Sequence, residues 1–189
     1  ENGVIVDREF EHTKGFPGEG PGAARNDFRI GSANITGGKA LIRAFKAGEF
    51  EDIDILLIQE HRQGVVANWA RRVEGWGWHV MAALAMKTKL GGYSGGVAIL
   101  WRKWVKVSSV PADIGWGPYL RGRAIRAIWH SRWGPIGISL VYGVVDNGDE
   151  NMDLVCPLQK DNLCMGCHVV VGGDFHAIVQ YCLLGIGDG

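Results

Sequence analysis

Acidic residues are almost missing from the middle third of this sequence, although the whole chain carries 20 Lys and Arg and 20 Asp and Glu. Residues 61–135 contain 12 basic and 2 acidic residues, a net charge of +10. Residues 1–60 contain 7 and 11, and residues 136–189 contain 1 and 7, for net charges of −4 and −6. A basic segment of this kind can bind the phosphates of a nucleic acid, or it can be neutralised by acidic segments elsewhere in the fold.

Long apolar runs are also missing. No stretch approaches the roughly 18 apolar residues of a membrane-spanning helix, and the first 25 residues lack the apolar centre of a secretory signal. The sequence therefore indicates no membrane span. The chain begins with Glu1 rather than Met, which is compatible with a processed product or a fragment and leaves the cellular compartment open.

Cysteine is scarce, with four residues in the chain. Cys164, Cys167 and His168 form the C-x-x-C-H pattern of c-type haem attachment, and two further cysteines with His176 are close enough in sequence to suggest zinc: Cys156 and Cys182. A β-branched run follows His168 directly, whereas haem attachment usually opens a helix. We therefore expect buried or loop thiols at these positions, and neither haem nor zinc.

Glycine, by contrast, is abundant, with 29 of the 189 residues. Residues 1–27 are polar and glycine-rich without periodicity, which predicts an extended arm, and residues 28–189 read as one domain. Within that domain, apolar runs end at glycine, proline or charged turns and alternate at first with helical patterns. The predicted helices are 39–47 and 65–75, and the predicted strands are 28–35, 53–58, 76–82, 96–101, 105–110, 123–129, 136–142 and 169–172.

Two of these predicted strands end in a carboxylate. The run from Ile53 to Ile58 leads to Glu60, and the run from Val169 to Val171 leads through two glycines to Asp174. Open α/β sheets hold their ligands at the carboxyl ends of strands, where two acids can meet at one metal ion or water. We predict that the strands 28–35, 53–58, 96–101 and 169–172 share a sheet, with both acids at the same edge.

The order of these pieces resembles the endonuclease/exonuclease/phosphatase superfamily, above all its retroelement-type endonucleases. Four segments carry the resemblance, with a fifth at Leu140 to Gly143 (LVYG). They are Phe28 to Ile35 (FRIGSANI), Asp54 to Glu60 (DILLIQE), Gly95 to Leu100 (GGVAIL) and Gly172 to His176 (GGDFH). The resemblance implies an α/β fold in which two sheets form a sandwich with flanking helices.

The resemblance also implies a role for particular residues. Glu60 and Asn34 would bind Mg²⁺, or Mn²⁺ in its place, because hard cations take oxygen ligands. Asp174 would orient or deprotonate the attacking water, and Tyr142 would contact the scissile phosphate. His176 stands where the family usually has Asn; an imidazole also donates a hydrogen bond, but it titrates near neutrality.

The family's chemistry further requires an Asp–His pair late in the sequence, and no histidine follows His176 in this chain. We therefore expect a C-terminally incomplete domain, either a fragment of a longer protein or a domain whose exposed sheet a protein partner covers. The first functional hypothesis is a metal-dependent phosphodiesterase, DNA endonuclease-like, that is inactive as this isolated chain. The alternative is a degenerate, non-catalytic domain that serves as a structural or binding subunit of a larger assembly.

Overall fold

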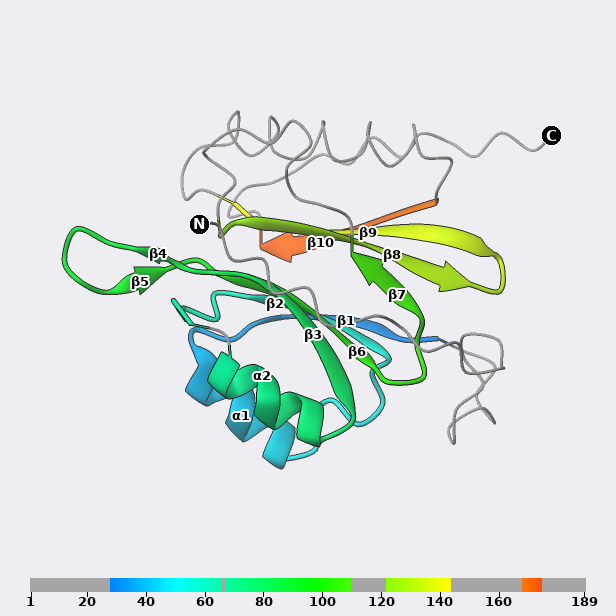
Figure 1. The fold of residues 1–189 in the computed structure, drawn as a ribbon, viewed down its shortest axis with the longest axis horizontal. Helices are drawn as coiled ribbons and strands as arrows, with labels where there is room; N and C mark the ends of the chain where they lie inside the picture. Colours follow the sequence, from blue (N-terminus) through cyan, green and yellow to red (C-terminus); the bar gives the residue numbers. More distant parts are fainter. Residues whose placement is uncertain (1–27, 66, 110–121, 144–167, 175–189) are drawn as a thin grey trace.

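The structure is a computed structural model that describes residues 28–65, 67–109, 122–143 and 168–174 (Figure 1). The predicted arm at 1–27, all four cysteines and His176 lie outside these residues. The described part contains two helices and two four-stranded sheets that face each other, together with a small two-stranded hairpin.

The first sheet has the strand order β1-β2-β6-β3. Its strands are β1 (Ile30–Asn34), β2 (Ile55–Gln59), β3 (Trp78–Ala83) and β6 (Val97–Arg102). β1 and β2 are parallel, and β6 is antiparallel to both β2 and β3. β1 and β2 therefore end at the edge of the sheet where β6 begins.

The second sheet has the order β10-β9-β8-β7. Its strands are β7 (Val107–Ser109), β8 (Ala124–Ser131), β9 (Gly134–Tyr142) and β10 (His168–Asp174). β7, β8 and β9 pair antiparallel, whereas β9 and β10 are parallel. β9 and β10 therefore end side by side.

β2 is the most completely buried strand and shows why the sandwich holds together. All five of its residues are buried, and alternate side chains point to opposite faces. Ile55 and Leu57 pack into the core between the two sheets, and Leu56 and Ile58 pack under the helices. Complete burial of each such side chain contributes about 2 kcal/mol. Because both faces of the strand are buried, its sequence is apolar from Ile55 to Ile58 and does not alternate with polar residues.

The helices α1 (Gly38–Lys46) and α2 (Ala67–Gly75) cover the outer face of the first sheet (Figure 1). Leu41 of α1 and Trp69 and Val73 of α2 are buried against this sheet. α1 follows β1 and α2 follows β2, so both helices begin at the edge where these strands end. No helix in the described ranges is long and apolar enough to cross a membrane.

The hairpin of β4 (Met86–Lys87) and β5 (Tyr93–Ser94) projects from the same end of the molecule (Figure 1). It pairs through two residues on each strand. At its tip Leu90 is 99% exposed. The sequence prediction missed this hairpin because its strands are too short to show an alternating pattern.

The predicted fold class, an α/β two-sheet sandwich with flanking helices, is confirmed. The prediction that residues 169–172 belong to the sheet of β1, β2 and β6 is wrong, since β10 pairs with β9 in the second sheet. Gly172 of β10 instead faces β2 across the sandwich, where an added Cβ would lie 2.4 Å from Leu57 Cδ1. An apolar run predicts a buried strand but does not specify which sheet it joins.

A second correction concerns the start of α2. The sequence placed Val65 on its apolar face, but the helix begins at Ala67 and Val65 is 66% exposed. Four tryptophans are buried in the core: Trp69, Trp78, Trp101 and Trp129. Two others, Trp76 and Trp133, are exposed.

Candidate functional site

The carboxyl ends of β1, β2, β9 and β10 meet at one edge of the sandwich. Asn34 at the end of β1 pairs in register with Gln59 of β2, the residue before Glu60. Asp174 at the end of β10 pairs in register with Tyr142 at the end of β9. Because the Tyr142 hydroxyl donates a hydrogen bond to Glu60 Oε1, the ends of the two sheets lie together. We call this the site edge.

Glu60 is the central side chain of the site edge. It follows the buried strand β2 and is itself 8% exposed. Tyr142 donates to its Oε1, and Arg62 Nη2 lies 2.7 Å from its Oε2 in an ion pair. The carboxylate is thus fixed from two directions, by a phenol of the second sheet and by a guanidinium of its own turn.

The backbone of this turn is strained. Glu60 and Arg62 have φ angles of +55° and +51°, in the left-handed region that non-glycine residues rarely adopt. The turn is held by hydrogen bonds from His61 N to Gly96 O (3.1 Å) and from Arg62 N to Gly95 O (3.0 Å). Such strain persists only where the surrounding structure enforces it, and it is concentrated at functional sites.

His61 provides much of that enforcement. The side chain is completely buried; its Nδ1 accepts a hydrogen bond from Gln63 N (3.1 Å) and its Nε2 lies 3.0 Å from Ala83 O. A carbonyl can only accept, so these partners assign the proton to Nε2 of a neutral ring. Burial lowers the pKa of His61 to about 4, so the ring is neutral at physiological pH.

Gly96 makes room for this imidazole. Its φ is +84°, and an added Cβ would lie 2.5 Å from His61 Cε1. Glycine is therefore required here both by backbone conformation and by contact. The Gly95-Gly96 pair that opens the GGVAIL segment accordingly supports the turn that carries Glu60.

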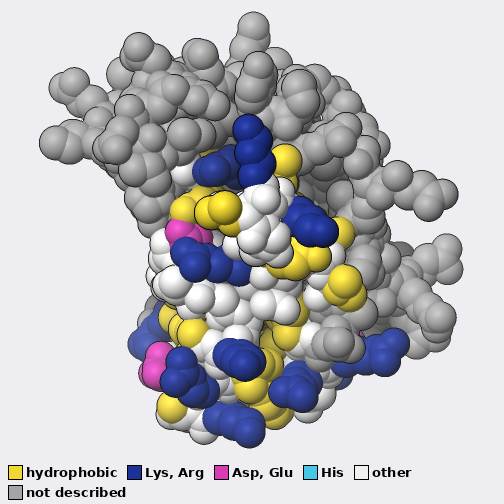
Figure 2. Space-filling view, turned by 90° about the vertical axis from the view of Figure 1, so that its left-hand side faces the viewer, with side chains coloured by type: hydrophobic (Ala, Val, Ile, Leu, Met, Phe, Trp, Pro, Cys, Tyr) yellow, Lys and Arg dark blue, Asp and Glu magenta, His cyan; other side chains and the backbone are white. Residues whose placement is uncertain are grey.

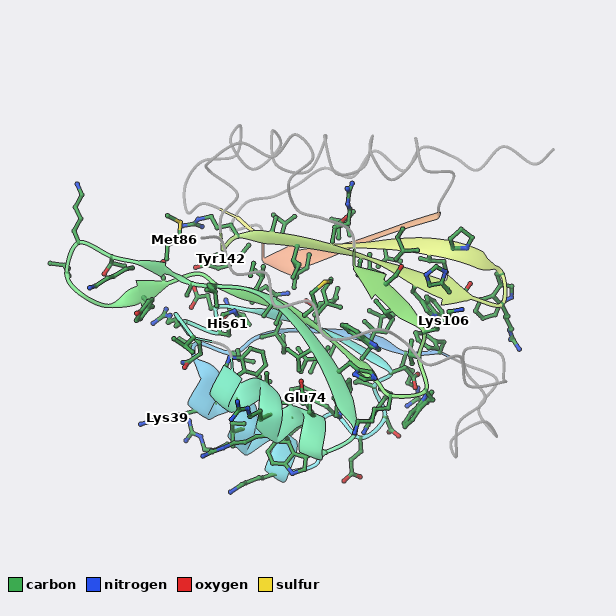
Figure 3. All side chains as sticks on the ribbon, in the orientation of Figure 1. Lys39, His61, Glu74, Met86, Lys106 and Tyr142 are labelled. Atoms are coloured by element: carbon green, nitrogen blue, oxygen red, sulfur yellow. The ribbon has the colours of Figure 1, made fainter. Side chains whose placement is uncertain are left out.

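Tyr142 is 6% exposed and joins the site edge to a second basic residue. The guanidinium of Arg123 lies over its ring, 5.1 Å from the centroid, and Arg123 Nη1 donates to Gly143 O at 2.8 Å. Figure 3 shows Tyr142 and His61 at the same end of the molecule. The edge thus combines one buried carboxylate with two arginines, Arg62 and Arg123.

The other predicted site residues are placed by their backbones. Asn34 is exposed, and its Oδ1 accepts a hydrogen bond from Thr36 N at 3.3 Å. Asp174 lies at the site edge by its register with Tyr142; its side chain is not described. Of the five predicted residues, the structure therefore brings Glu60 and Tyr142 into contact and places the strand positions of Asn34 and Asp174 beside them. His176 lies outside the described residues.

The donors at this edge suit a hard cation. Glu60 and Asn34 offer carboxylate and amide oxygens from neighbouring strand ends, and Mg²⁺ often takes only one or two protein carboxylates and keeps several waters. Within the described ranges, no group of three or more His, Cys, Asp and Glu side chains gathers as a metal cluster.

Sequence reasoning missed His61, Arg62 and Arg123. A signal for the first two was present, because Glu60, His61 and Arg62 stand as three consecutive charged or titratable residues directly after a buried strand. Arg123 gave no local signal, since its position depends on the pairing of β8 with β9.

Comparison with solved structures places this arrangement among known folds. The 3'-5' exonuclease NExo from Neisseria meningitidis is similar over 77% of this chain, at 19% identity and a TM-score of 0.55. This chain has the fold of the endonuclease/exonuclease/phosphatase superfamily. An AP endonuclease from Archaeoglobus fulgidus is also similar in structure to the present chain, over 78% of its length, with 16% identity and a TM-score of 0.54.

The endonuclease domain of TRAS1, a telomere-specific non-LTR retrotransposon, also has the superfamily fold, with 16% identity and a TM-score of 0.50 over 81% of this chain. The present chain covers 57% of the NExo and AP endonuclease chains and 61% of the TRAS1 domain. No protein-family model matches the sequence, and no curated protein does.

Proposed function

We propose that this chain carries the metal- and phosphate-binding edge of a divalent-metal-dependent phosphodiesterase that acts on nucleic acid. The observation that carries the proposal is the contact between Glu60 and Tyr142, which joins the carboxyl ends of both sheets. The similar folds include an exonuclease, an AP endonuclease and a retrotransposon endonuclease domain, all of which act on nucleic acids by their names.

Each residue of the site edge has a proposed role that follows from its chemistry. Glu60 and Asn34 would hold Mg²⁺ or Mn²⁺, and the bound ion would supply stabilisation of the charge that develops on the phosphate. Tyr142 holds the Glu60 carboxylate in place through its hydroxyl. Arg62, whose side chain is 46% exposed, would donate to a phosphate oxygen.

Asp174, whose strand ends beside Tyr142, would orient or deprotonate the attacking water. His176 would add a hydrogen bond to the phosphate. These 189 residues contain no histidine after His176 and so lack the late Asp–His pair. Since catalytic groups of this kind act as a unit, we propose that the chain binds metal and nucleic acid but by itself cleaves DNA orders of magnitude more slowly than complete enzymes.

Metal binding tests the first half of this proposal. Titration of the full chain with Mn²⁺, followed by calorimetry, should detect a site that Glu60→Gln weakens at least about tenfold, because one carboxylate is the main anionic ligand. Glu49→Gln is the matched control, since it removes the same charge from an exposed position after α1. No Mn²⁺ binding by the unmodified chain, or equal weakening by both variants, would overturn the proposal.

Cleavage tests the second half. Supercoiled and abasic DNA are incubated with the chain and Mg²⁺ or Mn²⁺, and the nicked product is measured for the unmodified chain, Glu60→Gln and Asp174→Asn. We expect no significant cleavage. Robust cleavage that both substitutions abolish would show that this edge suffices for catalysis. Nucleic-acid binding without metal binding would instead favour the non-catalytic alternative, a binding subunit that a protein partner completes.

A further inference from the structure

The helical layer carries basic side chains that the proposed chemistry does not use. Five exposed Lys and Arg residues lie on the two neighbouring helices α1 and α2, and within the described ranges none of the five forms an ion pair. They are Lys39, Arg43 and Lys46 on α1 and Arg71 and Arg72 on α2. We call these five residues the helical basic surface.

Helix stability explains only part of this concentration of charge. Lys39, Arg43 and Lys46 are spaced by four and three residues, so they share one face of α1 and repel one another. Lys39 also stands in the first turn, where the helix dipole disfavours a positive charge, although the dipole favours Arg43 and Lys46 in the last turn. A bound polyanion would attract all of these side chains and so offset the repulsion between them.

Acidic neighbours offset only part of the charge of this surface, which has five basic residues and one acidic residue on its two helices. The nearest acids along the chain are Glu74 on α2, three residues after Arg71, and Glu49, Glu51 and Asp52, which follow the end of α1. Asp52 is engaged with Arg29, at 3.4 Å between Oδ2 and Nη1. The first turns of the helices are free of acidic residues.

The helical basic surface continues the site edge. Both helices begin where β1 and β2 end, which is where Asn34 and Glu60 lie. Figure 2 looks onto this side of the molecule and shows Lys and Arg side chains spread over most of its described part, with few acidic ones. Figure 3 shows Lys39 on the same side as His61 and Tyr142.

We propose that the helical basic surface is a second contact site for the nucleic acid, which binds the phosphates of a segment that flanks the one at the site edge. This inference rests on the proposed function for its choice of polyanion. Lys39 and Arg43 stand one turn apart, about 6 Å along the helix. The surface lies beside the site rather than in it, so only a long ligand reaches both.

The test compares two variants that remove three charges each. Lys39→Gln/Arg43→Gln/Arg71→Gln neutralises the helical surface. Lys103→Gln/Lys106→Gln/Arg132→Gln neutralises exposed residues at the opposite edge, where β6 ends and β8 turns into β9; Lys106 is labelled there in Figure 3. Binding is measured in EDTA by fluorescence anisotropy with labelled duplexes of about 8 and about 24 base pairs, which span roughly 27 and 80 Å.

We expect the helical variant to bind the long duplex roughly tenfold to a hundredfold more weakly at moderate salt, and with a shallower dependence on salt concentration, because each lost phosphate contact removes about 0.9 from the slope. Binding of the short duplex should change far less. The opposite-edge variant should bind both duplexes as the unmodified chain does. Circular dichroism checks that both variants are folded.

Several outcomes would overturn the inference: equal weakening by the two variants, equal weakening for both duplexes, or no duplex binding by the unmodified chain. Binding of phosphatidylserine vesicles that the helical substitutions abolish, without any effect on the long duplex, would assign the surface to a membrane instead. If the helical variant binds duplex normally while Glu60 still binds Mn²⁺, this inference fails and the proposed function stands. If the chain does not bind Mn²⁺ but the helical variant still weakens binding of the long duplex, the proposed function fails and the helical basic surface remains a nucleic-acid contact.

Discussion

The two ends of the sandwich are built very differently. At the site edge, where β1, β2, β9 and β10 end, three non-glycine residues have positive φ: Thr36, Glu60 and Arg62. Buried polar side chains, Glu60 and His61, also lie there. At the opposite edge, β8 turns into β9 through Gly134, which has a φ of +106° and nothing within 4 Å of an added Cβ.

This difference indicates what each edge is for. The opposite edge is a tight turn whose residues, such as Trp133, are exposed and whose geometry glycine satisfies without strain. The site edge holds a buried carboxylate and a strained turn, which cost stability and are kept in place by packing and hydrogen bonds. Stability measurements on matched substitutions at the two edges test this difference.

The largest difference is expected between two glycine substitutions. Gly96→Ala should lower the free energy of unfolding by about 4 kcal/mol, because its Cβ meets the His61 ring and its backbone is left-handed. Gly134→Ala has the backbone penalty alone, about 1–2 kcal/mol. Urea unfolding of the two variants measures this difference, and equal losses would mean that the His61 contact is not tightly packed.

The next effect is a pH dependence that arises at the site edge. Burial lowers the pKa of His61 from 6.5 to about 4, so the unfolded chain takes up a proton there before the folded chain does. The stability contributed by the neutral ring is complete above pH 6.5 and is lost as pH falls toward 4, by up to about 3 kcal/mol.

Comparison with His61→Gln isolates this dependence from that of the carboxylates. Glutamine has a donor and an acceptor but does not titrate in this range. Urea unfolding in EDTA between pH 7 and pH 4 should therefore show a smaller loss of stability for His61→Gln than for the unmodified chain. Identical pH profiles would show that His61 is protonated within the fold or is not buried.

The smallest difference in stability is expected between substitutions of two arginines. Arg62→Gln removes the ion pair with Glu60, whose carboxylate is mostly buried, and should cost about 1 kcal/mol. Arg132→Gln at the opposite edge removes only a contact with the exposed Trp133 ring and should cost at most about 0.5 kcal/mol. If Arg132→Gln lowered the free energy of unfolding more than Arg62→Gln does, the ion pair at the site edge would not be the stronger of the two interactions.

The sequence predicted those parts of the fold that depend on local patterns. The apolar run of β2 and the helical periodicity of Trp69 and Val73 were sufficient, because burial imposes these patterns residue by residue. The resemblance placed Glu60 and Tyr142 in one site, and the structure brings them into contact. Their catalytic roles stay predictions.

Other features depended on contacts that no local pattern encodes. β10 joins the second sheet because its glycines let it approach both β2 and β9; an added Cβ on Gly173 would lie 2.0 Å from Val141 O. The role of His61 depends on Ala83 and Gly96, which are far from it in sequence. Such positions become visible only when the strands are placed in space.

The hydrogen bond between Tyr142 and Glu60 has a mechanical consequence. Together with the hydrogen bond from Gly96 N to Gly122 O (2.7 Å), it adds polar links at the site edge between two sheets that also pack through an apolar core. A ligand that binds residues of both sheets there would oppose their separation. It would raise the melting temperature in proportion to the logarithm of its concentration and would slow amide exchange in strands far from the bound ligand.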